Sequence, residues 1–350
     1  PIGGKKRGVL TMRRALVLLG LFVCVSSARA TDDEVAAFYK GKQIHLVVGS
    51  GVGSGYDINA RMVARHWGAH IPGNPTIVVQ NQPGAGSLIT TNTLANTAAK
   101  DGTAIAAVIN GVPTAPLLQP DAARFDPLKL NWIGSTNRDT QVIYAWHTSP
   151  VRELRDLLSK ELIIGATSSG TTQVDFPVVT NAILGTRFKV VSGYEGTAQI
   201  HKAMEAGEVQ GLGALAWSSL KTLNADWIAN GKIRILAQWS SPAHPDLTAY
   251  PLVESLAKTD EDRLALTLLT SRLEAGRPFV APPGVPPVRV AALRKAFDET
   301  MRDPALLAEA KRLLLDIEPM TGEEVAALVK SVLATPPAVV SRVRKVLDGK

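Results

Sequence analysis

Small polar residues and glycines gather in several short turns of the sequence, where their hydroxyl and backbone N–H groups could bind an anion. The first turn, Gly49 to Asp57, holds four glycines at alternate positions and leads into a helical pattern. Helix N-termini carry partial positive charge and unpaired N–H groups, which favour anions. Similar turns lie at 81–87, 110–114, 168–172 and 193–196. The candidate ligand-binding residues are Ser50, Gly51, Gly53, Ser54, Gly55, Tyr56, Asp57, Gly86, Ser87, Asn110, Ser168, Ser169, Gly170, Thr171, Thr172, Tyr194, Glu195, Gly196 and Trp217.

Basic side chains are missing from most of these turns. The stretches 49–57, 81–87, 168–172 and 193–196 contain no Lys or Arg. We therefore expect backbone N–H groups, hydroxyls and water to hold the anion, rather than a guanidinium group. Arg138 and Arg187 are the basic residues that could still reach the anion, but we expect both at the surface. Asp57 could cap the first helix or face the ligand. Trp217 could pack in the core or stack on the ligand.

Familiar catalytic and cofactor motifs do not fit this sequence. The glycine turn lacks the third glycine of G-x-G-x-x-G, and no Gly-Lys-Ser/Thr follows it, which argues against a dinucleotide site and a P-loop. His66 and His70 have metal-ligand spacing, but no Glu lies between them and the sequence offers no clear third ligand. No G-x-S-x-G nucleophile motif is present. We predict no catalytic residues, no metal and no cofactor, and therefore not an enzyme.

The polar turns follow apolar stretches that we interpret as strands. Strands are predicted at Ile44–Val48, Thr76–Gln80 and Thr103–Ile109, with helices at Ile58–His70 and Leu88–Ala99 between them. This β-α-β-α-β order predicts a parallel sheet with right-handed crossovers. Ligands of open α/β sheets bind at the carboxyl ends of the strands, where these turns lie.

A second α/β unit is predicted after two further strands. The stretches Trp132–Ser135 and Gln141–His147 lead into it, and a helix is expected at Val151–Lys160. Its other strands are predicted at Leu162–Thr167, Phe188–Ser192, Val209–Leu215 and Ile233–Trp239. The chain then offers a late strand and three helices. These are Arg277–Ala281, Val288–Met301, a helix started by a Thr321/Glu324 capping box, and one opened by Pro336-Pro337.

The first thirty residues have the pattern of a secretory signal peptide. A basic segment precedes an apolar stretch from Ala15 to Val25, and Ala28-Arg29-Ala30 is a cleavage site after Ala30. Removing this leader takes away six basic residues, so the formal charge falls from +7 to +1 and no longer suits nucleic acid. The single cysteine, Cys24, is lost as well. We expect a periplasmic monomer without disulfides that does not insert into the membrane after cleavage.

Several longer runs carry a family resemblance. They are Gly41-Lys-Gln-Ile44 with Val47-Val-Gly49, Gly55-Tyr-Asp57 and Ala60-Arg61 after it, Val78-Val-Gln-Asn-Gln-Pro-Gly-Ala-Gly-Ser87, Lys100-Asp-Gly-Thr103, Gly193-Tyr-Glu-Gly196, Gly207-Glu-Val209 and Phe279-Val-Ala-Pro-Pro-Gly-Val-Pro286. Their order and types resemble the periplasmic receptors of tripartite tricarboxylate transporters, the Bug family. The similarity covers essentially the whole mature chain.

This resemblance implies a type II periplasmic binding-protein fold of the α/β class, with two α/β domains around a ligand cleft. Domain 1 would comprise 31–136 plus 273–350, and domain 2 would comprise 137–272. It also implies a small organic acid ligand, gripped by the loops at 49–57 and 168–172 largely through backbone groups and water. The receptor would close on the ligand like a Venus flytrap and deliver it to the transporter membrane subunits.

Two positions depart from the family pattern. Tyr56 stands before Asp57 where family members often have a small hydroxyl residue, which leaves ligand size open. Gln210 follows Gly-Glu-Val where Asp is common. A periplasmic sensor that presents its ligand to a signalling partner is the alternative function, and an enzyme acting on a carboxylate is a further one. The sequence does not specify which carboxylate binds.

Overall fold

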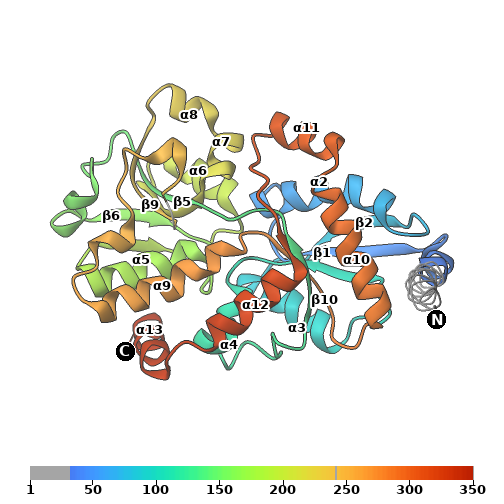
Figure 1. Cartoon of the computed structure of the whole chain (residues 1–350). Coiled ribbons are helices and arrows are strands. Elements are labelled where there is room, and N and C mark those ends of the chain that lie inside the picture. Colours follow the sequence, from blue (N-terminus) through green and yellow to red (C-terminus); the bar gives the residue numbers. More distant parts are fainter. Residues whose placement is uncertain (1–31, 241–242, 350) are drawn as a thin grey trace, which may run out of the picture.

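The structure is a computed structural model that describes residues 32–240 and 243–349, and the predicted leader at 1–30 lies outside them. The described residues form two sheets, of six and five strands, in two halves that lie side by side (Figure 1). Within these residues no single helix is long and apolar enough to cross a membrane. One pair of helices, α12 (Gly322–Leu333) and α13 (Pro337–Leu347), meets that test only when the two are taken together, and it is bent by 86°.

The first sheet has the strand order β11-β4-β10-β3-β1-β2. Its strands are β1 (Gln43–Val48), β2 (Thr76–Asn81), β3 (Ala104–Ala107), β4 (Asn131–Ser135), β10 (Pro278–Ala281) and β11 (Met320–Thr321). β1 pairs in parallel with both β2 and β3, which confirms the predicted β-α-β-α-β unit. The crossover helices are α2 (Gly55–His70) and α3 (Leu88–Asn96). α3 ends three residues before the predicted end at Ala99, because Thr97 leaves helical geometry.

The second sheet has the strand order β7-β6-β8-β5-β9. Its strands are β5 (Gln141–Trp146), β6 (Leu162–Gly165), β7 (Phe188–Val191), β8 (Gly211–Ala216) and β9 (Ile233–Trp239). β6 is parallel to β7 and β8, whereas β5 is antiparallel to β8 and β9. The helices α5 (Thr172–Leu184) and α6 (Thr197–Glu205) follow β6 and β7.

The helix predicted at Val151–Lys160 is wrong in extent and type. Only a 3₁₀ turn, η3 (Leu154–Leu158), forms there. Its capping box starts at Glu153, and the Lys160 ammonium donates to the Pro150 carbonyl oxygen at 3.2 Å, so the segment closes after one short turn. The capping box at Thr321/Glu324 and the proline start of the last helix are both confirmed.

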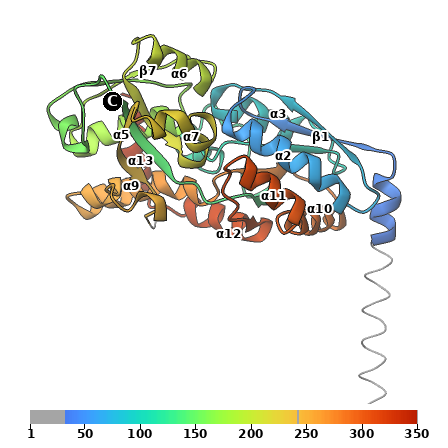
Figure 2. The same ribbon diagram turned by 90° about the horizontal axis from the view of Figure 1, so that it is seen from above.

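The remaining helices surround the two sheets (Figure 2). Residues 32–39 are also helical. The other helices are α4 (Ala115–Leu118), α7 (Trp217–Leu223), α8 (Ala225–Ala229), α9 (Asp260–Glu274), α10 (Pro287–Thr300), α11 (Pro304–Arg312), α12 (Gly322–Leu333) and α13 (Pro337–Leu347). The 3₁₀ turns besides η3 are η1 (Ala85–Ser87), η2 (Val112–Thr114), η4 (Pro245–Leu247) and η5 (Val253–Leu256).

Each half has an aromatic core. In the first half the Trp67 ring makes edge contacts with Phe279 and Phe297, at centroid distances of 5.9 and 5.6 Å. In the second half Phe176 packs on Trp239 at 4.5 Å. These rings are fully buried and bury large apolar areas, so each half has an aromatic core of its own.

The chain passes between the halves at 136–140, from β4 to β5, and again at 275–277, from α9 to β10. We call these two stretches the crossing segments. They run side by side, because the Asp139 N–H donates to the Leu273 carbonyl at 2.7 Å and the Gly276 N–H donates to the Asn137 carbonyl at 3.0 Å. A Cβ on Gly276 would lie 2.6 Å from the Asp139 Cβ, so this close approach needs glycine.

The domain boundaries at 136/137 and 272/273 stay a prediction, although no strand of either sheet spans them. The last helix, α13, falls in domain 1 by that prediction. Its residues Val339, Val340 and Val343 nevertheless belong to the core cluster of the second half, with α5 and α9. The Arg344 guanidinium also donates to the Leu117 carbonyl in α4 at 3.1 Å, so α13 contacts both halves.

Candidate ligand-binding site

A cavity of about 130 Å³ lies between the two halves, where the polar turns meet. The first half contributes the turns after β1, β2 and β3, and the second half contributes those after β6 and β7. Four helices, α2, α3, α5 and α6, begin at these turns and direct the positive ends of their dipoles towards it. The two halves also touch here, since the Gly86 N–H donates to the Ser168 hydroxyl at 3.2 Å.

Most of the predicted site residues line this cavity. Those that do are Ser50, Gly51, Ser54, Gly55, Tyr56, Gly86, Ser87, Asn110, Ser168, Thr171, Thr172, Glu195 and Gly196. Gly53, Asp57, Ser169, Gly170, Tyr194 and Trp217 are outside its lining among the residues that the structure describes.

Ser87 ties three turns of the first half together. Its hydroxyl donates to the Gly49 carbonyl at 2.8 Å and accepts from the Ile109 N–H at 3.1 Å. Ser50 and Ser54 form a separate hydroxyl pair, 2.8 Å apart, and Ser54 caps α2 by accepting from the Asp57 N–H. The first half therefore presents pre-arranged hydroxyls and N–H groups to the cavity.

Asp57 has a structural position rather than one facing the cavity. Its buried carboxylate accepts from the Gly53 N–H at 2.8 Å, from Arg61 Nε at 2.9 Å and from Asn81 Nδ2 at 2.8 Å. The cap of α2 is Ser54, so the expectation that Asp57 caps this helix is wrong in detail. The Asp57 carboxylate instead links the first turn of α2 to the glycine loop before it through these hydrogen bonds.

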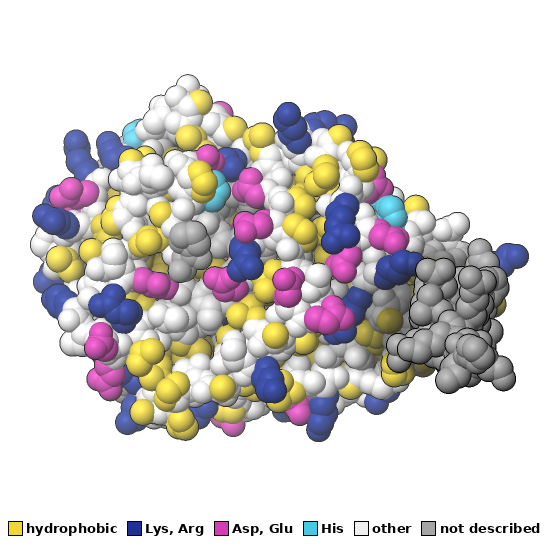
Figure 3. Space-filling model, in the orientation of Figure 1, with side chains coloured by type: hydrophobic (Ala, Val, Ile, Leu, Met, Phe, Trp, Pro, Cys, Tyr) yellow, Lys and Arg dark blue, Asp and Glu magenta, His cyan; other side chains and the backbone are white. Residues whose placement is uncertain are grey.

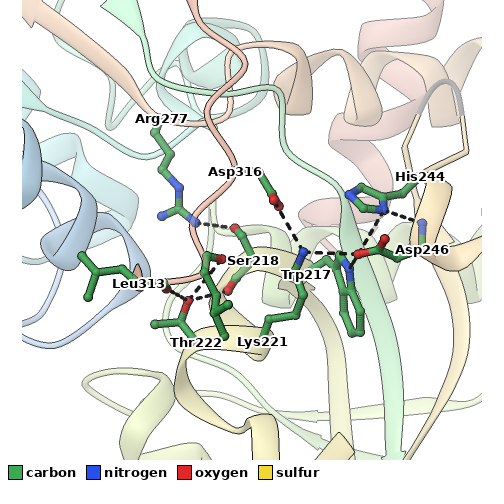
Figure 4. Close-up of polar contacts among 10 residues, drawn as sticks. Trp217, Ser218, Lys221, Thr222, His244, Asp246, Arg277, Leu313 and Asp316 are labelled. Carbon is green, nitrogen blue, oxygen red and sulfur yellow. Dashed lines mark hydrogen bonds and ion pairs between the residues drawn. The ribbon is translucent and has the colours of Figure 1, made fainter. Parts of the chain in front are cut away.

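Trp217 and Gly170 also lie away from the cavity. The Trp217 indole N–H donates to Asp246 Oδ2 at 2.9 Å, and its ring lies beside Lys221 (Figure 4). Gly170 donates its N–H to Asp175 and accepts from Arg272 Nη2 at 2.7 Å. Arg272 and Asp175 form a buried ion pair at 2.7 Å that holds the turn before α5.

Arg277 is one of the cavity residues that the sequence interpretation missed. The turns themselves have no basic residue, but Arg277 enters the cavity from the second crossing segment and is buried. Its Nη2 donates to the Ser219 hydroxyl at 3.0 Å and its guanidinium lies 5.0 Å from the Tyr56 ring centre. The longer contact of Nη2 to Ser218, 3.4 Å, is drawn in Figure 4. Nη1 has no hydrogen-bond partner among the described residues.

How the anion is held stays a prediction, but Arg277 places a guanidinium group in the lining of the cavity. The sequence did contain a signal for this residue. Arg277 stands between Gly276 and Pro278 at the start of a predicted strand that is buried, where a charged side chain is unusual.

Asp139 and Gln141 were missed as well. Both are buried and line the cavity, and Gln141 Nε2 donates to Asp139 Oδ2 at 3.1 Å. Burial raises the pKa of the Asp139 carboxyl above its ordinary value, and the nearby charge of Arg277 opposes this rise. Gln141 Oε1 and Asn110 Nδ2 have no hydrogen-bond partners in the described part of the chain. Both atoms are buried and belong to residues that line the cavity.

Charges elsewhere are mixed. On the face shown in Figure 3 acidic and basic side chains are interspersed, and several of both signs lie where the two halves meet. Among the described residues no group of three or more His, Cys, Asp or Glu side chains could hold a metal ion. His66 and His70 instead contact Glu309 and Asp303, at 2.8 and 2.9 Å.

Comparisons with known proteins place this geometry in a family. The family model described as "Tripartite tricarboxylate transporter family receptor" matches residues 60–343. The UPF0065 protein in gbd 5'region of Cupriavidus necator is 24% identical over 340 residues, covering 94% of each protein.

Two solved structures have similar folds. The periplasmic binding protein BugD has a TM-score of 0.70 and 22% identity, covering 88% of this chain and 98% of BugD. MatC from Rhodopseudomonas palustris, solved with bound malate, has a TM-score of 0.67 and 18% identity, covering 87% of this chain and 99% of MatC. The predicted α/β fold and family resemblance are confirmed. The chain belongs to the tripartite tricarboxylate transporter family receptors, which are periplasmic solute-binding proteins.

Proposed function

We propose that this protein captures a small carboxylate in the cavity between its halves and delivers it to the membrane subunits of a tripartite tricarboxylate-type transporter. The observation that carries the proposal is the buried Arg277 guanidinium. Its Nη1 donates no hydrogen bond to any residue that the structure describes. A buried cation with an unused donor is costly unless an anion binds it.

The size of the cavity favours a small ligand. Its volume of about 130 Å³ is below the roughly 300–1,000 Å³ of sites for drug-sized molecules. Helix N-termini from both halves supply further N–H groups. MatC, which has the same fold, was solved with a carboxylate, malate.

Closure would be a hinge motion about the crossing segments. The ligand contacts both halves in the closed form and only one in an open form, so it binds the closed form more tightly and shifts the population towards it. The protein would act after export and removal of residues 1–30, as a monomer.

A thermal-shift screen tests the proposal. Residues 31–350 are unfolded, freed of carried-over ligand, refolded, and melted with mono-, di- and tricarboxylates and amino acids. A ligand at 100 times its dissociation constant adds about 2.7 kcal/mol to the free energy of unfolding. We expect at least one carboxylate to raise the melting temperature. The proposal is wrong if the folded protein responds to none of these acids but does respond to uncharged or cationic solutes.

A further inference from the structure

Three turns of the first half each bring a glycine very close to the backbone of the second half. We call Gly51, Gly86 and Gly111, which follow β1, β2 and β3, the closing glycines. A Cβ built on any of them would meet a backbone carbonyl oxygen of the second half. The distances from this Cβ to the oxygen are 3.1 Å from Gly51 to Glu195, 3.2 Å from Gly86 to Ser169 and 2.6 Å from Gly111 to Gly170.

Backbone conformation does not explain two of these glycines. Gly111 has φ −75° and ψ −20°, which is ordinary right-handed helical geometry, and Gly51 does not have a positive φ. Residues with side chains adopt such conformations without strain. Gly86 differs, because its φ of +61° favours glycine by itself. At Gly51 and Gly111 the need for glycine therefore comes from the space that the second half occupies.

The Gly170 carbonyl is held firmly in its place against Gly111. It accepts from Arg272 Nη2 at 2.7 Å, and the buried Arg272 is paired with Asp175 at 2.7 Å. The Gly170 N–H also donates to Asp175 Oδ1 at 3.0 Å. Arg272 Nη2 would itself lie 2.7 Å from a Cβ on Gly111. A methyl group at position 111 would therefore push the two halves apart, because neither neighbour is free to move aside.

We propose that the closing glycines set how closely the two halves approach, and that positions 51 and 111 need glycine for closure rather than for the fold of the first half. Side chains there would leave each half intact and hold the protein partly open. The apparent affinity for the ligand then falls with the population of the closed form. This inference rests on the proposed function. It gives a positioning role to Gly111, which lies outside the lining of the cavity.

Gly111→Ala tests the inference without changing a residue that lines the cavity. Residues 31–350 contain no cysteine, so Thr97→Cys after α3 and Lys202→Cys on α6 place one spin label on each half at an exposed position. Double electron–electron resonance gives the distance between the labels, with and without the best acid from the thermal screen. Calorimetric titration gives the affinity for that acid.

We expect the acid to shift the wild-type labels to a single closed-form distance. Gly111→Ala should reach that distance only in part and bind the acid at least about fivefold more weakly, because overpacking opposes closure. Without ligand, its midpoint of urea unfolding should stay that of the wild type.

Gly68→Ala is the matched control. A Cβ on Gly68, in α2, would lie 2.5 Å from the Pro75 carbonyl oxygen, so the clash is of the same kind but stays within the first half. Gly68 is also outside the lining of the cavity. This variant should unfold at lower urea, yet the folded protein should reach the wild-type closed-form distance and bind the acid with wild-type affinity.

The inference and the proposed function fail in different ways. If folded Gly111→Ala reaches the closed-form distance and binds as tightly as the wild type, the inference is overturned and the carboxylate receptor stands. If no acid binds the wild type, both are overturned. Should Gly111→Ala not fold, the label distance in Gly51→Ala decides. If neither variant folds, the inference is wrong, because these glycines then serve the fold of the first half.

Discussion

The turns of the first half pack so closely against one another that one added carbon atom would push them apart. A Cβ built on Gly49 would lie 2.3 Å from the Ser87 hydroxyl oxygen and 2.7 Å from the Ser87 Cβ. That hydroxyl links the Gly49 carbonyl to the Ile109 N–H, so a side chain at 49 would separate three turns that line the cavity.

We therefore predict that Gly49→Ala destabilises the protein by about 1–3 kcal/mol, through overpacking and lost hydrogen bonds. It should also weaken ligand binding, because the displaced turn carries Ser50. Urea unfolding and calorimetric titration measure the two effects. Unchanged stability together with unchanged affinity would show that this contact does not position the turn.

His201 makes a second prediction at the residue scale. It is buried against Trp227, its Nε2 lies within hydrogen-bond distance of the Tyr144 hydroxyl at 2.8 Å, and burial lowers its pKa from 6.5 to about 4. In the pH range from 6.5 to 4 the unfolded chain binds a proton here and the folded protein does not. Stability is therefore complete above pH 6.5 and falls as the pH drops through this range.

The loss between pH 7 and pH 5 should be about 2 kcal/mol for this one group. His201→Gln keeps an acceptor for Tyr144 but has no such titration, so its stability should depend less on pH, as measured by urea unfolding at both pH values. His147→Gln, at an exposed histidine, should follow the wild type. A slope in His201→Gln equal to that of the wild type would contradict the argument.

The sequence alone identified most of the hydroxyl and glycine residues that line the cavity, but not its buried charged residues, Asp139 and Arg277. Ser, Thr and Gly next to strand ends are recognisable because turn chemistry is local. Arg277 is more than 200 positions from the first turn, and only the path of the crossing segment brings them together. Asp57 could have faced a ligand, yet Arg61 one turn further along α2 and Asn81 at the end of β2 occupy its carboxylate.

At the scale of elements, α7 is one of the parts of the second half that contact the first. The Lys221 ammonium donates to Asp246 in its own half at 3.3 Å and to Asp316 of the first half at 3.5 Å (Figure 4). The Thr222 hydroxyl also bonds the Leu313 carbonyl at 2.6 Å. These contacts join α7 to the segment after α11 in the arrangement described here.

We predict that Asp316→Asn weakens ligand binding by about two- to fivefold, because part-exposed ion pairs contribute up to about 1 kcal/mol and this one would favour the closed form. The matched control is Asp226→Asn, which removes a 3.7 Å ion pair with Lys232 inside the second half. Calorimetric titration should show a loss of ligand affinity in Asp316→Asn and none in Asp226→Asn. Equal affinities in the two variants would mean that α7 does not favour closure.

Elements with strong local signals were predicted well, and others were overlooked. The capping box of α12 and the β-α-β-α-β unit follow from residues close together in sequence. α9 was not predicted, although Thr259 caps it and three acidic residues open it. A helix was predicted at Val151–Lys160, but only Leu154 and Leu157 of η3 are buried, too few to support a longer helix.

At the scale of the whole molecule, the sequence order predicts two α/β units but not how the last helix is placed. Pro336-Pro337 correctly predicts the start of α13, whereas its packing on α5 and α9 depends on the assembled fold. The cavity has the same dependence, since two crossing segments and turns from both halves must meet to form it.

The central claim is that this cavity holds a carboxylate through Arg277. The most direct measurement is a calorimetric titration of the best acid from the thermal screen into the wild type, Arg277→Gln and Arg187→Gln. Arg187 is exposed and lies outside the cavity, so it controls for loss of a positive charge. We predict at least about tenfold weaker binding in Arg277→Gln and a change below about twofold in Arg187→Gln. A folded Arg277→Gln protein that binds the acid as tightly as the wild type would contradict the account.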